Sequence, residues 1–135
     1  MKKIALFLVL MTTLLSCSLD EPDSYTYYVL PIESYTLPET FVKGESHEIK
    51  LKYQKPTACY IYGGIYYYSE NSTRTIGINA SVKNGENCSD TLPPETEVSF
   101  NFTPTTAGVY TFKFYKGEDD AGEDEFEEVE ITVTE

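Results

Sequence analysis

The sequence has no tryptophan, a single histidine (His47) and only three cysteines among its 135 residues. No zinc-binding spacing, nucleophile elbow or phosphate-binding loop is present. Basic residues are also scarce, since 10 Lys and Arg stand against 22 Asp and Glu, giving a formal net charge of −12. So acidic a surface argues against nucleic acid as a partner. These absences predict a protein that is not an enzyme and that uses no cofactor.

Glycoside hydrolysis is one reaction for which so acidic a chain has suitable residues, because a pair of carboxylates can catalyse it. Against this, the predicted fold places about seven strands in roughly 105 residues, which leaves little room for a deep substrate cleft. We therefore keep the prediction that the protein is not an enzyme.

No apolar run reaches the roughly 20 residues that a membrane-spanning helix requires. The longest run, residues 4–15, follows two lysines and ends at a small residue, which is typical of a secretory signal peptide. Cys17 comes directly afterwards, and Leu14-Leu15-Ser16-Cys17 resembles the lipobox of bacterial lipoproteins. In that family the cysteine thiol receives a diacylglycerol, the peptide is cut before it, and the new amine is acylated. The resemblance implies a signal peptide over residues 1–16 and lipidation, with palmitate as a typical acyl group, at Cys17.

The residues after Cys17 also resemble a targeting signal. Ser18-Leu19-Asp20-Glu21-Pro22-Asp23 is similar to the acidic surface-export signal of lipoproteins from one group of Gram-negative bacteria. It implies a location on the outer membrane, exposed at the cell surface, with the lipid as the only membrane contact. Removing the leader with its two lysines changes the formal charge from −12 to −14.

The remaining chain, about 120 residues, is long enough for one domain and too short for two. Residues 17–28 are polar, acidic and without apolar periodicity, so they predict a flexible tether. The domain is therefore expected over residues 29–135.

Apolar and polar residues alternate with period two along most of that domain. The clearest segments are residues 48–53, 75–82, 98–102, 110–114 and 128–133. This pattern is typical of half-buried antiparallel strands. Two less regular strands are expected at 29–37, interrupted by Pro31, and at 58–68, where Gly63-Gly64 predicts a bulge. About seven strands and no helix outside the leader predict an all-β antiparallel sandwich.

Residues 102–112 (FTPTTAGVYTF) resemble the corner between strands E and F of immunoglobulin-like and fibronectin-like domains. Phe41-Val42-Lys43-Gly44-Glu45 is similar to their A–B connection. In those families a tyrosine at the start of strand F hydrogen-bonds back across the corner, and Tyr110 is the candidate. The resemblance implies an immunoglobulin-like sandwich and carries no function of its own.

With Cys17 lipidated, Cys59 and Cys88 remain as a pair in an oxidising compartment, which predicts a disulfide bond. Closing a loop of about 30 residues would remove unfolded-state entropy worth about 3.5 kcal/mol. The alternative is a pair of buried thiols.

Two surface features are candidates for binding. The loop over residues 117–128 is dense in carboxylates, and Asp119, Asp120 and Asp124 are the candidates for calcium ligands. Their spacing fits no known calcium loop, so we favour a solvated hairpin loop that holds no metal.

The second feature is aromatic. Five tyrosines in one strand region form a possible binding face, with more tyrosines just upstream at residues 25–28. The five are Tyr60, Tyr62, Tyr66, Tyr67 and Tyr68. Exposed tyrosines suit the recognition of proteins or sugars, and the alternative is tyrosine used for cross-strand packing. The function expected is thus a non-catalytic interaction module with a protein or glycan partner at the cell surface. A tyrosine-based glycan-binding module and a structural spacer are the alternatives.

Overall fold

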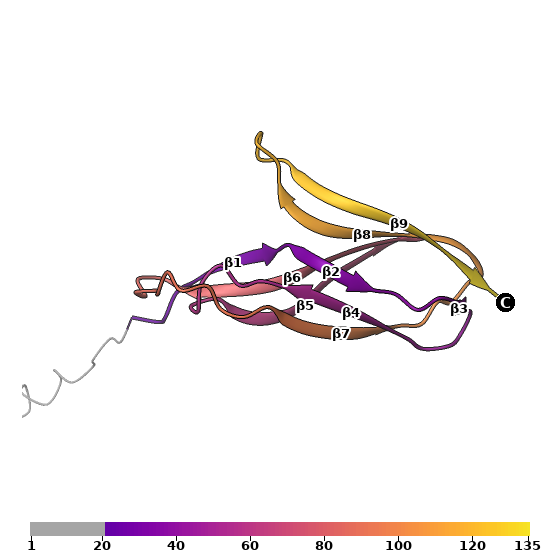
Figure 1. The fold of residues 1–135 in the computed structure, drawn as a ribbon, viewed down its shortest axis with the longest axis horizontal. Helices are drawn as coiled ribbons and strands as arrows, with labels where there is room; N and C mark the ends of the chain where they lie inside the picture. Colours follow the sequence, from indigo (N-terminus) through magenta and orange to yellow (C-terminus); the bar gives the residue numbers. More distant parts are fainter. Residues whose placement is uncertain (1–20) are drawn as a thin grey trace, which may run out of the picture.

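Two sheets built from nine strands make up residues 21–135, the part of the chain that the computed structural model describes (Figure 1). The strands are β1 (Tyr25–Leu30), β2 (Ile32–Thr36), β3 (Phe41–Val42), β4 (His47–Tyr53), β5 (Ile61–Glu70), β6 (Thr73–Lys83), β7 (Thr96–Phe102), β8 (Gly108–Glu118) and β9 (Asp124–Thr134). The described residues form no helix, hence none long and apolar enough to cross a bilayer. The expected signal peptide and Cys17 lie outside the described residues.

The larger sheet has six strands in the order β1-β6-β8-β9-β3, with β5 also paired to β6. The smaller sheet has the order β2-β4-β7. The all-β prediction is therefore confirmed. The expectation of a purely antiparallel sandwich is corrected, because β6 pairs with β8, and β3 with β9, in parallel. Parallel neighbours arise here because the strand between β6 and β8 in sequence, β7, belongs to the other sheet.

Pro31 divides the strand expected at residues 29–37 between two strands, β1 and β2. β1 ends at Leu30 and pairs with β6 in the large sheet, whereas β2 starts at Ile32 and pairs with β4 in the small sheet. Proline has no N–H to donate to a ladder and has a fixed φ, so the chain changes sheets at this residue. Pairing also begins at Tyr25, inside the segment expected to be a flexible tether, because residues 25–28 pair with residues 80–83 of β6.

The core lies between the two sheets and consists almost entirely of the alternating apolar residues. Fully or nearly fully buried members are Ile32, Ile49, Leu51, Tyr53, Ile76, Ile78, Phe102, Phe112, Phe114 and Val133. Aromatic contacts join the sheets: the Phe102 ring meets the Phe112 ring edge-to-face at 5.1 Å, and Tyr35 stacks on Phe114 at 3.9 Å between centroids. The Tyr110 hydroxyl donates to the Thr106 carbonyl across the corner, at 3.2 Å.

One edge of β6 is shared between two partner strands. Its first half, Thr73 to Ile76, pairs with Thr111 to Phe114 of β8. Its second half, from Ile78 to Lys83, pairs with β1. The residue between the two stretches is Gly77. Beyond Phe114, β8 has no partner on this side, and Figure 1 shows the β8–β9 hairpin curving away from the other strands.

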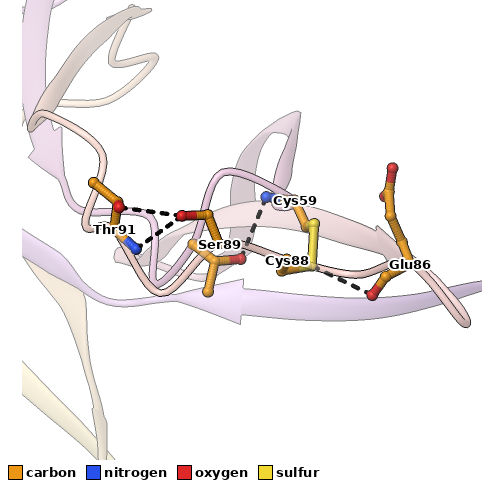
Figure 2. The surroundings of a disulfide bond; sticks show 6 residues. Cys59, Glu86, Cys88, Ser89 and Thr91 are labelled. Carbon is orange, nitrogen blue, oxygen red and sulfur yellow. Dashed lines mark hydrogen bonds between the residues drawn. A yellow bond between two sulfur atoms is a disulfide. The ribbon is translucent and has the colours of Figure 1, made fainter.

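The predicted disulfide is formed. The Cys59 and Cys88 sulfur atoms are 2.05 Å apart and the Cα atoms 5.7 Å. Figure 2 shows that the bond joins the loop before β5 to the loop between β6 and β7. The Cys59 N–H donates to Thr57 Oγ1 at 3.3 Å. Cys88 Sγ lies 3.7 Å from the Glu86 carbonyl, a contact rather than a donated hydrogen bond, because a bridged sulfur carries no proton.

Candidate functional site

The five predicted tyrosines divide between the two faces of the large sheet. Tyr66 and Tyr68 pair with Gly77 and Thr75 of β6, and both lie on the outer face, away from the small sheet. Tyr62 and Tyr67 pair with the core residues Ala80 and Ile76 and lie on the inner face. The division follows from the bulge at Gly63-Gly64, where the register between β5 and β6 shifts as predicted.

The inner-face tyrosines are used for packing, as the alternative interpretation expected. The Tyr62 ring stacks on the Tyr53 ring, with centroids 6.0 Å apart. Tyr67 meets Phe100 of β7 edge-to-face at 5.7 Å. Tyr60 lies just before β5, and its ring is 5.2 Å from that of Tyr28. The predicted tyrosines therefore do not share one face: Tyr66 and Tyr68 are on the outer face, whereas Tyr62 and Tyr67, 40% and 43% exposed, are on the inner face.

A pocket of about 390 Å³ lies on the outer face, where β8 and β9 part from β6. We call it the aromatic groove. Its lining residues come from five strands and are Tyr27, Tyr28, Val29, Tyr66, Thr75, Tyr115, Glu118, Asp124 and Phe126. Aromatic rings and two carboxylates thus border one depression. Tyr27 is the most exposed of these rings, at 80%.

Gly77 lies at the buried centre of this outer face. A Cβ added there would lie 2.6 Å from Val29 Cγ1, 3.5 Å from Tyr115 Cβ and 3.8 Å from Tyr66 Cβ. Side chains from β1, β5 and β8 therefore meet above the one residue of β6 that has no side chain. The packing here depends on this glycine, because an added Cβ would overlap Val29 of β1, whereas Tyr115 and Tyr66 already lie at ordinary contact distance from it.

The far wall of the groove is acidic and ordered. The Tyr115 and Phe126 rings lie 5.8 Å apart, and the Lys113 ammonium lies 4.6 Å from the centre of the Phe126 ring. Burial raises the pKa of the Tyr115 phenol, and the nearby negative charges of Asp124 and then Glu118 raise it further. Tyr115 is thus a hydrogen-bond donor at neutral pH, beside carboxylates that only accept.

The three calcium candidates have separate positions. Asp119 Oδ1 accepts the N–H groups of Ala121, at 2.8 Å, and Glu123, at 2.9 Å. It thereby closes the β8–β9 turn, which is a common use of aspartate. Asp124 lines the aromatic groove, and Asp120 lies exposed in the turn. Within residues 21–135, no three His, Cys, Asp or Glu side chains are grouped so that they could hold a metal ion.

His47 has a structural contact. The Val42 N–H donates to its Nε2 at 2.9 Å, and its ring packs on Phe41, with centroids 4.9 Å apart. This contact fixes the connection between β3 and β4. No nucleophile or carboxylate bonds to the ring among the described residues.

Several residues of the groove were not predicted. Tyr115 and Phe126 face each other across the β8–β9 pair, directly opposite in register. The alternation at residues 110–114, extended by one residue, would have indicated that Tyr115 is on the outer face. Nothing in the sequence indicated that β1 and β8 would meet at the same edge of β6, and that meeting forms the groove.

The chain matches no protein-family model, and no curated protein or solved structure is similar enough to match it. Its function is therefore inferred from the groove and its residues.

We expect Gly77→Ala to destabilise the domain by about 1–3 kcal/mol, because the new Cβ overlaps Val29 and a packed strand must shift. Urea unfolding followed by circular dichroism measures the change. Gly63→Ala is the matched control, since its Cβ would meet nothing closer than the Asn79 oxygen at 3.4 Å. That variant should match the parent protein to within about 0.5 kcal/mol. Equal stability of both variants would contradict the packing described above Gly77.

Proposed function

We propose that this protein is a non-catalytic interaction module, anchored to the outer membrane by lipid on Cys17 and exposed at the cell surface. The anchor and the location are supported by the lipobox-like tetrad and the acidic residues after it. The aromatic groove is the contact surface, and its nine lining residues are the observation that supports this role most strongly. Tyrosine and phenylalanine present large, rigid contact areas that lose little conformational entropy on binding.

The finer fold assignment is part of this proposal. We infer a variant of the immunoglobulin-like sandwich, supported by the hydrogen bond from Tyr110 to Thr106 and by the sheet order β2-β4-β7. That order corresponds to strands A, B and E of the family. The parallel pair of β6 and β8 departs from the family pattern, in which neighbouring strands of the second sheet run antiparallel. The groove is located at this departure.

A photoreactive benzophenone amino acid in place of Tyr27 tests the proposed contact surface on intact cells. Tyr27 is on the rim of the groove and 80% exposed, so the probe keeps an aromatic ring where the partner would lie. We expect irradiation to link this variant to one partner, identified by mass spectrometry. The same probe in place of Lys50, exposed on the small sheet, should capture no such partner.

Two outcomes bear on the alternatives. Capture from Lys50 and Tyr27 alike would contradict a specific role for the groove. No capture from either position would favour a structural spacer. In a separate experiment, Cys17→Ser is expected to release the protein from the membrane, and its release would show that the probed protein is anchored by lipid.

A glycan-binding module is the second candidate, favoured by the chemistry of the groove. Aromatic faces of Tyr66 and Tyr27 suit the C–H faces of sugar rings, and the carboxylates of Glu118 and Asp124 accept hydrogen bonds from hydroxyl groups. The volume of about 390 Å³ is within the range of small-molecule sites. These features suit a neutral sugar better than an acidic one, because both charges in the lining are negative.

Titration of neutral oligosaccharides, followed by intrinsic tyrosine fluorescence, tests this candidate directly, because the chain has no tryptophan to mask the 12 tyrosines. We expect Tyr66→Ala to weaken binding by about tenfold, the loss of one aromatic contact of about 1.4 kcal/mol. Tyr68→Ala is the matched control, because Tyr68 shares the strand and the outer face but does not line the groove. Equal losses in both variants, or release of reducing sugar, would contradict a non-catalytic glycan site in the groove.

A further inference from the structure

A second pocket, of about 410 Å³, lies where the two sheets part, between β5 and β7. Its lining residues are Ile65, Tyr67, Ser69, Arg74, Phe100, Asn101, Phe102, Thr103 and Thr105. Tyr67 and Tyr66 face opposite sides of β5, so this pocket and the aromatic groove are on different faces of the large sheet. The lining contains one cation and no carboxylate, although the chain has 22 acidic residues.

Arg74 is the only arginine of the sequence, and the structure holds it in place. Its Nη1 donates to the carbonyl of Asn71, in the turn between β5 and β6, at 2.7 Å and to that of Thr73, the first residue of β6, at 2.9 Å. Its guanidinium carbon lies 5.0 Å from the centre of the Tyr110 ring and 5.8 Å from that of Phe102. The guanidinium is thus fixed at the wall of the pocket before any ligand arrives.

This cation has no ionic partner. Within the described residues no carboxylate lies within 4.0 Å of the Arg74 guanidinium, whereas Lys43, Lys52, Lys83, Lys113 and Lys116 each have one. Its two bonds to backbone carbonyls both use Nη1, and the guanidinium also lies close enough to the Tyr67 hydroxyl to act on its pKa through a hydrogen bond. Arginine presents five donors in a planar fork, so this side chain retains donors beyond these contacts.

Neutral polar residues share this pocket with the guanidinium. They are Tyr67, Ser69, Asn101, Thr103 and Thr105. Burial raises the pKa of the Tyr67 phenol, although the positive charge of Arg74 offsets part of the rise. Tyr67 therefore keeps its proton at neutral pH and can donate it. A half-buried cation in a pocket lined by neutral polar residues and by the aromatic residues Tyr67 and Phe100 suits an anion whose remaining part is less polar.

We propose that this pocket binds a small ligand that carries a carboxylate, which pairs with the free donors of Arg74. The planar fork of arginine matches a carboxylate in a two-bond geometry. Salt weakens the opposing effect of the protein's general negative charge, because the screening length is about 10 Å at 0.1 M salt. An acidic sugar and an N-acylated amino acid both supply the group, and the experiment distinguishes them. The site does not depend on the aromatic groove or on its partner.

Because the chain has one arginine, a nitrogen-15 spectrum of the folded protein contains one arginine Nε–Hε signal. We expect glucuronate or N-acetylglycine, titrated to about 10 mM, to shift this signal saturably, which corresponds to a Kd near or below that concentration. Whichever probe binds more tightly identifies the source of the carboxylate. Glucose and N-acetylglycine amide, which have the same bodies without the charge, should leave the signal in place.

The variant Arg74→Lys separates the guanidinium from simple positive charge. It should weaken binding at least about tenfold, because lysine cannot form the paired hydrogen bonds. Since this variant has no arginine signal, binding to it and to the parent protein is compared through the backbone amide signals of the pocket residues. The variant's amide spectrum, otherwise unchanged, shows that the domain is folded, and Lys83→Gln serves as a charge-loss control that should bind normally. No saturable shift with either acid, or an equal shift with chloride at the same ionic strength, would overturn the proposal.

Discussion

The structure depends on the way one edge of β6 is divided. A backbone edge can form a ladder with only one strand at a time, and this edge pairs with β8 up to Ile76 and with β1 from Ile78 onward. β8 must therefore leave the sheet after Phe114, and its hairpin with β9 curves outward (Figure 1). Gly77, at the change of partner, is the residue over which Val29, Tyr66 and Tyr115 meet. The aromatic groove is a consequence of this change.

The outward hairpin is held in place from the opposite side. The Lys116 ammonium donates to the Ile32 carbonyl at 2.7 Å, and the Tyr35 hydroxyl donates to Glu127 at 3.0 Å. Both contacts tie the hairpin to β2, at and just beyond Phe114, where β8 leaves β6. A wall fixed before binding favours affinity, because less conformational freedom is lost when the ligand arrives. The two pockets also differ in charge, since Glu118 and Asp124 border one and Arg74 the other.

Much of the fold was predictable because its signal is local. Alternation located β4, β6, β7, β8 and β9, and Gly63-Gly64 indicated the bulge in β5. The disulfide followed from counting cysteines. The change of sheet at Pro31 was not predicted. The pairing of Tyr25 to Tyr28 was not predicted either, because the composition of that segment is typical of a tether. Of the groove residues, Tyr66 was a predicted candidate. Tyr115, Phe126 and Gly77 were not, because the order of the strands in the sheet brings them to the groove, and alternation does not specify that order.

Nuclear Overhauser contacts between backbone protons test the division of the β6 edge most directly. The account predicts contacts of Arg74 and Thr75 with Phe112 and Lys113, followed by contacts of Ile78 and Ala80 with Leu30 and Tyr28. Backbone contacts between Gly77 to Ala80 and Tyr115 to Glu118 would mean that β8 continues alongside β6. That result would contradict the account, because the hairpin would close over the site where the groove lies.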